Sequence, residues 1–146
     1  MIEPVDKHNI DEVLPLIRLY QEFYNCRNID EARNREHFRQ FGLTSEMGCQ
    51  FLYRLDGSPV AFATIYFTFS STLPGKVGLM NDLFTSEACR GKGIGKQLIA
   101  HCLDYAKSQG ALRIQWFTAP DNLRAQRLYD SLPANKSEWL YYTYAE

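Results

Sequence analysis

The chain is predicted to fold as an α+β protein with a mixed, mostly antiparallel twisted sheet flanked by helices. Three observations predict this class. Three strand-like segments follow one another between residues 50 and 84, an amphipathic helix pattern follows a glycine-rich stretch, and shorter strand and helix patterns come after it. Consecutive strands followed by one strand–helix–strand unit are typical of α+β proteins and not of a repeating parallel array.

The N-terminal part is expected to form an edge strand and two helices. Residues 2–5 suit a short edge strand. A helix capped by Asn9 or Asp11 should end near Tyr24, because the apolar residues between them recur mostly at helical spacing. Residues 30–41 predict a second helix, which is rich in Arg and Glu and has few apolar residues. We therefore expect it to be a partly exposed cover and not part of the core.

The middle of the chain is expected to form a hairpin and a third strand. Residues 50–55 and 60–69 are predicted strands, joined by a turn at 56–59. A loop at 70–75 leads to the third strand, 76–84, whose density of apolar residues predicts burial on both faces.

The C-terminal part completes the predicted order. A helix from about 91 to 108 should end at Gly110, because glycine favours the backbone conformation that closes a helix. A strand at 112–118, a short helix at 122–132 and a final strand at 138–144 follow. The order is strand, helix, helix, three strands, helix, strand, helix and strand.

Bulk properties limit the classes of protein. The chain has 146 residues, 45% hydrophobic and 23% charged, which suits one globular domain spanning 1–146. The net charge of -1 disfavours a general nucleic-acid binder. No segment approaches the roughly 20 apolar residues of a membrane span, and the N-terminus has no secretion pattern. We therefore expect a cytoplasmic protein with neither nucleic acid nor membrane as a partner.

The four cysteines predict neither a metal site nor a disulfide framework. Cys26, Cys49, Cys89 and Cys102 form no C-x-x-C pair, and no histidine lies at metal-ligand spacing from them. No pattern links a thiol to one of the three histidines, which disfavours a catalytic cysteine. We expect reduced thiols and no bound metal.

A glycine-rich stretch, Arg90-Gly91-Lys92-Gly93-Ile94-Gly95-Lys96, precedes the predicted helix at 91–108. Glycines let backbone N–H groups approach a ligand, and a helix N-terminus adds unpaired donors, so the stretch suits a pyrophosphate. It is not a Walker loop, because Arg90 stands in place of the first glycine and Gln97 in place of the hydroxyl residue. It is not a dinucleotide fingerprint either, because the third glycine position falls on Lys96.

The spacing that fits is [QR]-x-x-G-x-[GA], at 90–95. Together with the strands at 77–84 and 111–118 and the N-x-x-A-x-x-L-Y run at 122–129, it resembles the GNAT superfamily of N-acetyltransferases. Asn81-Asp82-Leu83 resembles the Glu-Asp-Leu segment of its polyamine and thialysine acetyltransferase branch. The resemblance implies the acyl-CoA N-acyltransferase fold, acetyl-CoA as cosubstrate, a small-molecule amine such as a polyamine or amino acid as acceptor, and a homodimer.

The resemblance also implies a binding site for coenzyme A. Its residues would be Leu83, Phe84, Thr85, Arg90, Gly91, Lys92, Gly93, Ile94, Gly95, Lys96, Asn122 and Tyr129. Amides of the glycine loop would bind the pyrophosphate, and the backbone of 83–85 would pair with the pantetheine arm as a strand does. Arg90 would contact phosphate or anchor the loop, Lys92 and Lys96 would add charge or lie in solvent, and Asn122 would contact coenzyme A or only cap its helix.

Two catalytic residues follow from the same resemblance. Tyr129 aligns with the residue that protonates the departing thiolate in many members, and its alternative role is packing on the sheet. Asp82, at the end of a buried strand, is the candidate base, because an alkylammonium must lose a proton before it attacks. Its alternative role is structural, as an acceptor for backbone N–H groups.

The acceptor site is expected between the first two helices and the third strand, with acidic and aromatic side chains that suit a cationic amine. The candidate residues are Tyr20, Glu22, Tyr24, Tyr66 and Asp82, with Tyr141 and Tyr142 of the last strand. The chain departs from the family where Asp130-Ser131-Leu132-Pro133 replaces the usual Gly-Phe after Tyr129, so the helix must end differently. A non-catalytic coenzyme A-binding module and a protein N-acetyltransferase remain the competing functions.

Overall fold

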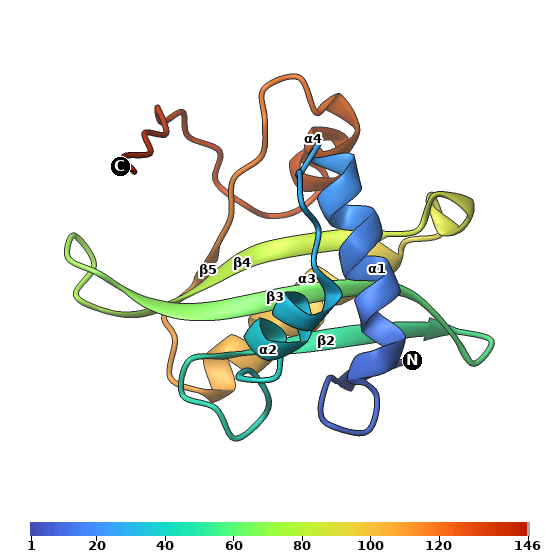
Figure 1. The fold of residues 1–146 in the computed structure, drawn as a ribbon. Helices are drawn as coiled ribbons and strands as arrows, with labels where there is room; N and C mark the ends of the chain where they lie inside the picture. The colour runs from blue at the N-terminus through green and yellow to red at the C-terminus, as the bar shows by residue number, and fades with distance from the viewer. Residues whose placement is uncertain (146) are drawn as a thin grey trace. The chain divides into compact units, whose positions relative to one another are not determined.

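A five-stranded sheet with helices on both faces forms the larger part of the computed structural model, which describes residues 1–145 (Figure 1). The elements in chain order are β1 (Ile2–Pro4), α1 (Ile10–Phe23), α2 (Glu31–Phe38), β2 (Gly48–Leu55), β3 (Ser58–Ser70), β4 (Gly75–Thr85), the 3₁₀ turn η1 (Glu87–Cys89), α3 (Ile94–Ser108), β5 (Ile114–Gln115) and α4 (Leu123–Asp130). The described chain divides into two compact units, 1–116 and 117–145.

The sheet lies entirely in the first unit and confirms the predicted class. Its strand order is β1-β2-β3-β4-β5, with antiparallel neighbours except for the parallel pair β4–β5. The long hairpin of β3 and β4 follows from the predicted strands, and consecutive residues in the middle of β3 are buried because the two helical layers cover both faces of the sheet. The crossover from β4 to β5 passes through α3.

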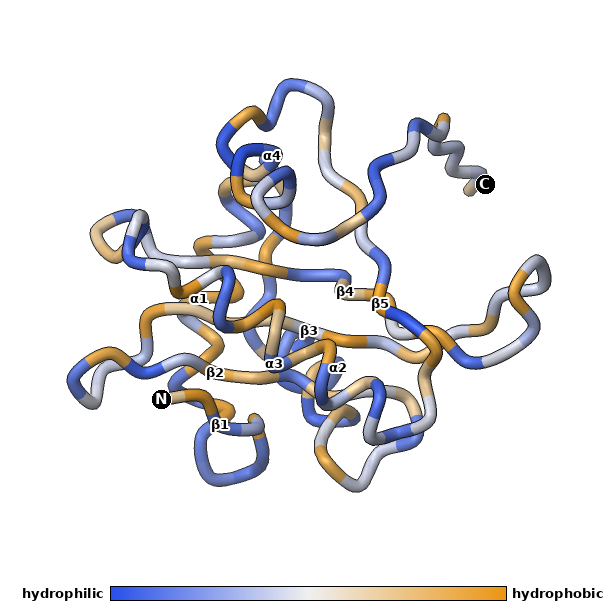
Figure 2. Tube along the Cα trace, turned by 180° about the vertical axis from the view of Figure 1, so that it is seen from behind, coloured by the Kyte–Doolittle hydropathy of each residue, from blue (hydrophilic) through white to orange (hydrophobic). Residues whose placement is uncertain are grey.

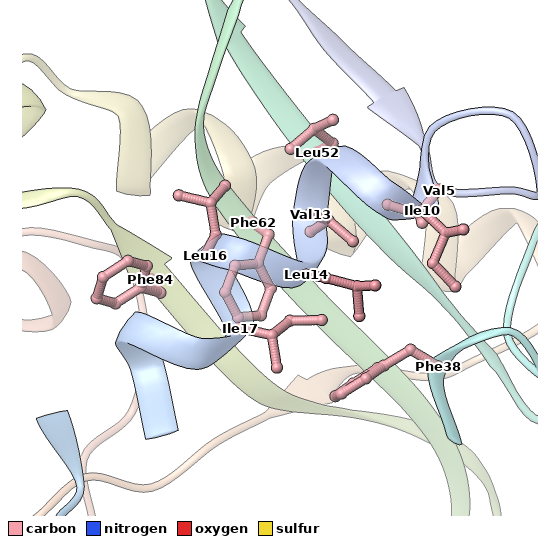
Figure 3. Close-up of a cluster of buried hydrophobic side chains, with 10 residues drawn as sticks. All are labelled: Val5, Ile10, Val13, Leu14, Leu16, Ile17, Phe38, Leu52, Phe62 and Phe84. Atoms are coloured by element: carbon pink, nitrogen blue, oxygen red, sulfur yellow. The ribbon is translucent and has the colours of Figure 1, made fainter. Parts of the chain in front are cut away.

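Helix α1 covers one face of the sheet, and α3 covers the other, which Figure 2 shows from behind. The α1 stripe packs on inward side chains of the strands in a continuous core (Figure 3). Its members are Val5, Ile10, Val13, Leu14, Leu16, Ile17, Phe38, Leu52, Phe62 and Phe84. Burying one such side chain stabilises the fold by roughly 1.5–3 kcal/mol, so this layer holds α1 firmly on the sheet.

Helix α2 is attached to the core more closely than its composition predicts. Phe38 joins the apolar cluster, and Asn34 is buried. Asn34 and Gln21 of α1 exchange two amide hydrogen bonds, both 2.8 Å long. The prediction of a cover without core residues is therefore wrong for these two positions, although the rest of α2 is exposed.

The C-terminal strands differ from the prediction. β5 contains two of the seven residues expected to form a strand at 112–118. The prediction of a final strand at 138–144 is wrong, because those residues have no strand pairing in the structure. Their aromatic side chains favour strands only when a neighbouring strand is present to pack and pair with. Tyr141 and Tyr142 are exposed, and the Tyr141 ring packs on Phe117, 5.4 Å between centroids. Among residues 1–145, no helix is long and apolar enough to cross a bilayer.

Candidate active site

The site is built around a β-bulge in β4. Thr64 pairs with Asp82, whereas the next residue of β3, Ile65, pairs with Met80, so Asn81 is an extra residue on β4. A bulge bends its strand and redirects the side chains beside it. As a result, Asp82 follows Met80 into the interior, while Asn81 between them is exposed.

Asp82 is a buried carboxylate with one oxygen available. Its side chain is 4% exposed, and its Oδ1 accepts a hydrogen bond from the Asn81 side-chain amide at 3.0 Å. Oδ2 has no aligned hydrogen-bond donor among the described residues. Burial raises the pKa of Asp82, and the nearby hydroxyls of Thr64 and Tyr20, with the Asn81 amide and the His37 ring, oppose that rise. A raised carboxyl pKa makes a stronger base, as proton abstraction requires.

A polar row crosses three strands at this level. Gln50 of β2 pairs with Thr64 of β3, which pairs with Asp82 of β4. The Gln50 amide donates to Thr64 Oγ1 at 3.1 Å, and both residues are fully buried. Because that oxygen is already an acceptor, the Thr64 O–H is left to donate toward the carboxylate.

Aromatic side chains from both helices and β3 surround Asp82. The Tyr20 hydroxyl donates to the Asn81 carbonyl at 3.4 Å, and the Tyr20 and Tyr24 rings meet edge to face, 4.9 Å between centroids. Burial, and secondly the charge of Asp82, raise the pKa of Tyr20, Tyr24 and Tyr66. These three hydroxyls therefore stay protonated at neutral pH and can act as hydrogen-bond donors in the site.

One residue of α2 belongs to the cluster around Asp82, and one predicted residue of α1 does not. His37 of α2 lies with its Nε2 3.1 Å from the Tyr66 hydroxyl, so it belongs to the same cluster. Glu22, by contrast, is exposed and forms an ion pair with Arg18 one turn earlier in α1, at 3.1 Å. The structure thus brings together Tyr20, Tyr24, Tyr66 and Asp82 of the predicted acceptor residues and does not place Glu22 with them.

Beyond the bulge, one edge of β4 is open. Only Gly78 and Leu79 pair with β5, so within the described residues no strand pairs with β4 along that edge from Met80 onward. The backbone of 83–85 lies on this stretch, as the predicted pairing with a pantetheine arm requires. The Phe84 side chain points into the core, so Phe84 can contribute to the open edge of β4 only through its backbone.

The glycine loop ends at the N-terminus of α3. Gly91 and Gly93 have φ angles of +79° and +76°, and a Cβ built at either one would meet nothing within 4 Å. Gly93 caps the helix through its carbonyl, which accepts from the Gln97 amide at 3.1 Å, and no side chain caps it. The amides of the first helical turn, 94–96, have no intrahelical partner and remain available to an anion.

The charged residues of the loop differ in placement. Arg90 is half-buried and donates from Nε to the Thr85 carbonyl at 3.0 Å, which ties the loop to the end of β4. Its guanidinium lies over the Phe84 ring, 5.9 Å from the centroid. Of the two roles expected for Arg90, the structure favours anchoring. Lys92 and Lys96 are exposed.

Asn122 and Tyr129 lie in the second unit. The Asn122 side chain accepts a hydrogen bond from the Ala125 amide at 3.2 Å and so caps α4. Tyr129 is half-buried near the end of the same helix, which closes at Ser131 without the glycine usual in the family. Their roles toward coenzyme A and the thiolate stay predictions.

The sequence did not single out Gln50, Thr64 or His37 as part of the site. Gln50 and Thr64 are polar residues in otherwise apolar strand segments, which is a visible signal, but their meeting with Asp82 depends on strand register. His37 lies in a charged helix and carries no distinguishing pattern.

Comparison with known proteins identifies the class to which this fold and site belong. The model of the Acetyltransferase (GNAT) family matches residues 14–132. The chain belongs to this family and is an N-acetyltransferase. The match includes the bulge, the glycine loop and α4, so it covers most of the first unit and reaches into the second.

Two relatives and one solved structure illustrate the similarity. An uncharacterized N-acetyltransferase of Bacillus subtilis, YhfO, is 30% identical over 118 residues, 81% of this chain and 78% of the relative. The D-amino-acid N-acetyltransferase HPA3 of Saccharomyces cerevisiae is 33% identical over 85 residues, 58% of this chain and 53% of the relative. AAC(6')-Iy in complex with the bisubstrate analog CoA-S-monomethyl-acetylneamine has a TM-score of 0.82 at 18% identity, covering 100% of this chain and 97% of that one. This last likeness concerns the fold alone.

Proposed function

We propose that the protein transfers the acetyl group of acetyl-CoA to a primary amine of a small molecule by direct attack within a ternary complex. The observation that carries this proposal is the buried Asp82 carboxylate on β4, at the point where one edge of that strand opens toward the glycine loop. Burying a charged carboxylate away from water costs free energy unless a cation or a proton binds to it. The ammonium group of an amine acceptor can supply either one.

The residues that would hold acetyl-CoA fit its chemistry. The unpaired amides at 94–96 and the open space at Gly91 and Gly93 suit a pyrophosphate, and the unpaired edge at 83–85 suits the amide-bearing pantetheine arm. Acetyl-CoA supplies the thioester whose acetyl group is transferred. Crystal structures of the aminoglycoside acetyltransferase AAC(6')-Iy hold coenzyme A or an analogue of it, which supports this assignment.

In the proposed mechanism, Asp82 takes a proton from the acceptor ammonium, either directly or through a water molecule, and leaves a neutral amine. The amine nitrogen forms the amide bond as the thioester C–S bond breaks. Tyr129 gives its proton to the sulfur, because a phenol pKa near 10 suits a thiolate of similar basicity. A backbone N–H on the open edge of β4 stabilises the oxyanion. The attacking nitrogen loses its second proton as the amide forms, Tyr129 regains a proton by way of solvent, and Asp82 releases the first proton to solvent, so that one proton is set free for each acetyl group transferred.

The experiment mixes the protein with acetyl-CoA and a panel of primary amines, amino acids and peptides, and follows free thiol release and product mass. Acceptor-dependent thiol release that is lost in Asp82→Asn would support the proposal. Acetylation of peptides alone would favour a protein N-acetyltransferase. Binding of coenzyme A without acceptor-dependent thiol release would instead indicate a non-catalytic module.

A further inference from the structure

A groove of about 640 Å³ opens beside the candidate active site. It lies between the end of α2, the segment before β2 and the far end of the β3–β4 hairpin. Most of its wall is apolar, from Phe41, Met47, Tyr66, Phe67 and Phe69. Met47 and Phe69 are 50% and 78% exposed, an unusual concentration of exposed apolar side chains around one hollow.

The groove is continuous with the Asp82 cluster. Tyr66 and His37 line the groove and also belong to that cluster, where the His37 ring contacts the Tyr66 hydroxyl at 3.1 Å. Tyr66 lies on the same face of β3 as Thr64, two residues or about 7 Å along the strand. An acceptor whose amino group lies at Asp82 can therefore extend past Tyr66 into the groove.

The charges on the groove do not suit a polycation. Its wall contains one carboxylate, Glu46, and two potential cations, His37 and Lys76. Lys76 is held in place, because its Nζ lies 4.1 Å from the Phe67 ring centroid and donates to the Gln109 carbonyl at 3.1 Å. These contacts place the Lys76 ammonium on the α3 face of the sheet, away from Asp82, so Glu46 is the one carboxylate of the wall that could pair with a second ammonium group of the acceptor.

We infer that the acceptor is a primary amine with one apolar arm of aromatic size, bound with its amino group at Asp82 and its arm in this groove. The inference rests on the proposed function and narrows its substrate class. It predicts that arylalkyl and similar amphiphilic monoamines are better acceptors than polyamines and aminoglycosides, which carry several positive charges.

The test compares 2-phenylethylamine, ethylamine and spermidine as acceptors in the thiol-release assay. We expect kcat/KM for 2-phenylethylamine to exceed that for ethylamine by about tenfold or more, because the ring buries apolar area in the groove. We expect kcat/KM for spermidine to be lower than kcat/KM for 2-phenylethylamine, the other amine that is long enough to reach the groove.

Groove variants provide the structural control. Phe41→Ala should raise KM for 2-phenylethylamine about fivefold and leave ethylamine unchanged, because the Phe41 ring lies beside Tyr66, 4.9 Å between centroids, and only the longer amine reaches it. Leu73→Ala removes an apolar side chain outside the groove and should change neither. Turnover of ethylamine or spermidine without a preference for 2-phenylethylamine would overturn this inference and leave the proposed function intact. No turnover of these three amines, beside turnover of an amino acid in the wider panel, would also overturn this inference alone, whereas no turnover across the whole panel would overturn both.

Discussion

Thr64 and Asp82 stand directly opposite each other across β3 and β4, at the residue pair where the bulge at Asn81 shifts the register of the two strands. The Thr64 oxygen accepts a hydrogen bond from Gln50 on its other side, at 3.1 Å. The hydroxyl therefore lies between a buried amide and a buried carboxylate. This arrangement makes the proton affinity of Asp82 depend on two residues that do not face the acceptor.

The Thr64→Val variant tests this dependence. In the native protein the Thr64 hydroxyl lowers the pKa of Asp82. Valine keeps the shape of threonine but removes this hydroxyl. We expect the pKa of Asp82 to rise and the acid limb of the pH profile of kcat/KM to move to higher pH. Thr68→Val, an exposed substitution on the same strand, should leave the profile unchanged. An unmoved acid limb in Thr64→Val would remove Thr64 from this role.

The Asp82→Asn variant should separate activity from stability. Turnover should fall about 100-fold or more, because the base is lost. Burial raises the folded-state pKa of Asp82 above the value near 3.9 of an unfolded chain. The folded protein thus holds this proton more tightly, and the resulting stability is present at low pH and lost as pH rises through the folded pKa.

The corresponding measurement is urea unfolding of both proteins between pH 4 and 8. Asparagine has no charge to bury, so the free energy of unfolding of Asp82→Asn, relative to wild type, should increase with pH. Asp104→Asn, an exposed change on α3, serves as the control and should show a smaller pH-dependent difference. A pH-independent difference for Asp82→Asn would contradict the assigned direction of its pKa.

The Tyr129→Phe variant tests the proposed acid. The ring is kept and the hydroxyl removed, so kcat should fall about 100-fold while the Kd for coenzyme A changes less than about twofold. Calorimetry and initial rates measure the two quantities separately. Tyr144→Phe, an exposed change in the same unit, is the control and should leave kcat unchanged. Normal turnover in Tyr129→Phe would remove this residue from the acid role.

The Gly93→Ala variant tests the anion site at α3. Gly93 has φ +76°, and alanine in this left-handed conformation costs roughly 1–2 kcal/mol. Gly110, at the other end of α3, has φ +86° and the same open space around a Cβ. Both alanine variants should lose about 1 kcal/mol of stability in urea unfolding, but only Gly93→Ala should weaken coenzyme A binding, by about tenfold. Equal coenzyme A affinities in the two variants would argue against the site.

Much of the fold was predictable from local pattern. The helical periodicity of α1 and α3 and the three long strands are signals that a few neighbouring residues carry, and the structure confirms them. The turn expected at 56–59 is shorter, because Ser58 and Pro59 already pair with β2 as the start of β3. The strand expected at 138–144 was wrong because strand formation requires a partner, which local pattern does not reveal. For the same reason β5 is limited to the two residues that pair with β4.

The candidate site was predictable only where it is contiguous in sequence. The spacing at 90–95 and the run at 122–129, together with the strands at 77–84 and 111–118, predicted the family, because each of these four features is local in sequence. The position of Asn81 as a bulge, the row from Gln50 to Asp82 and the groove beside Tyr66 were decided by the tertiary structure. Each depends on which residues of distant strands and helices meet, and one residue of register would have turned Asp82 to the opposite face of the sheet.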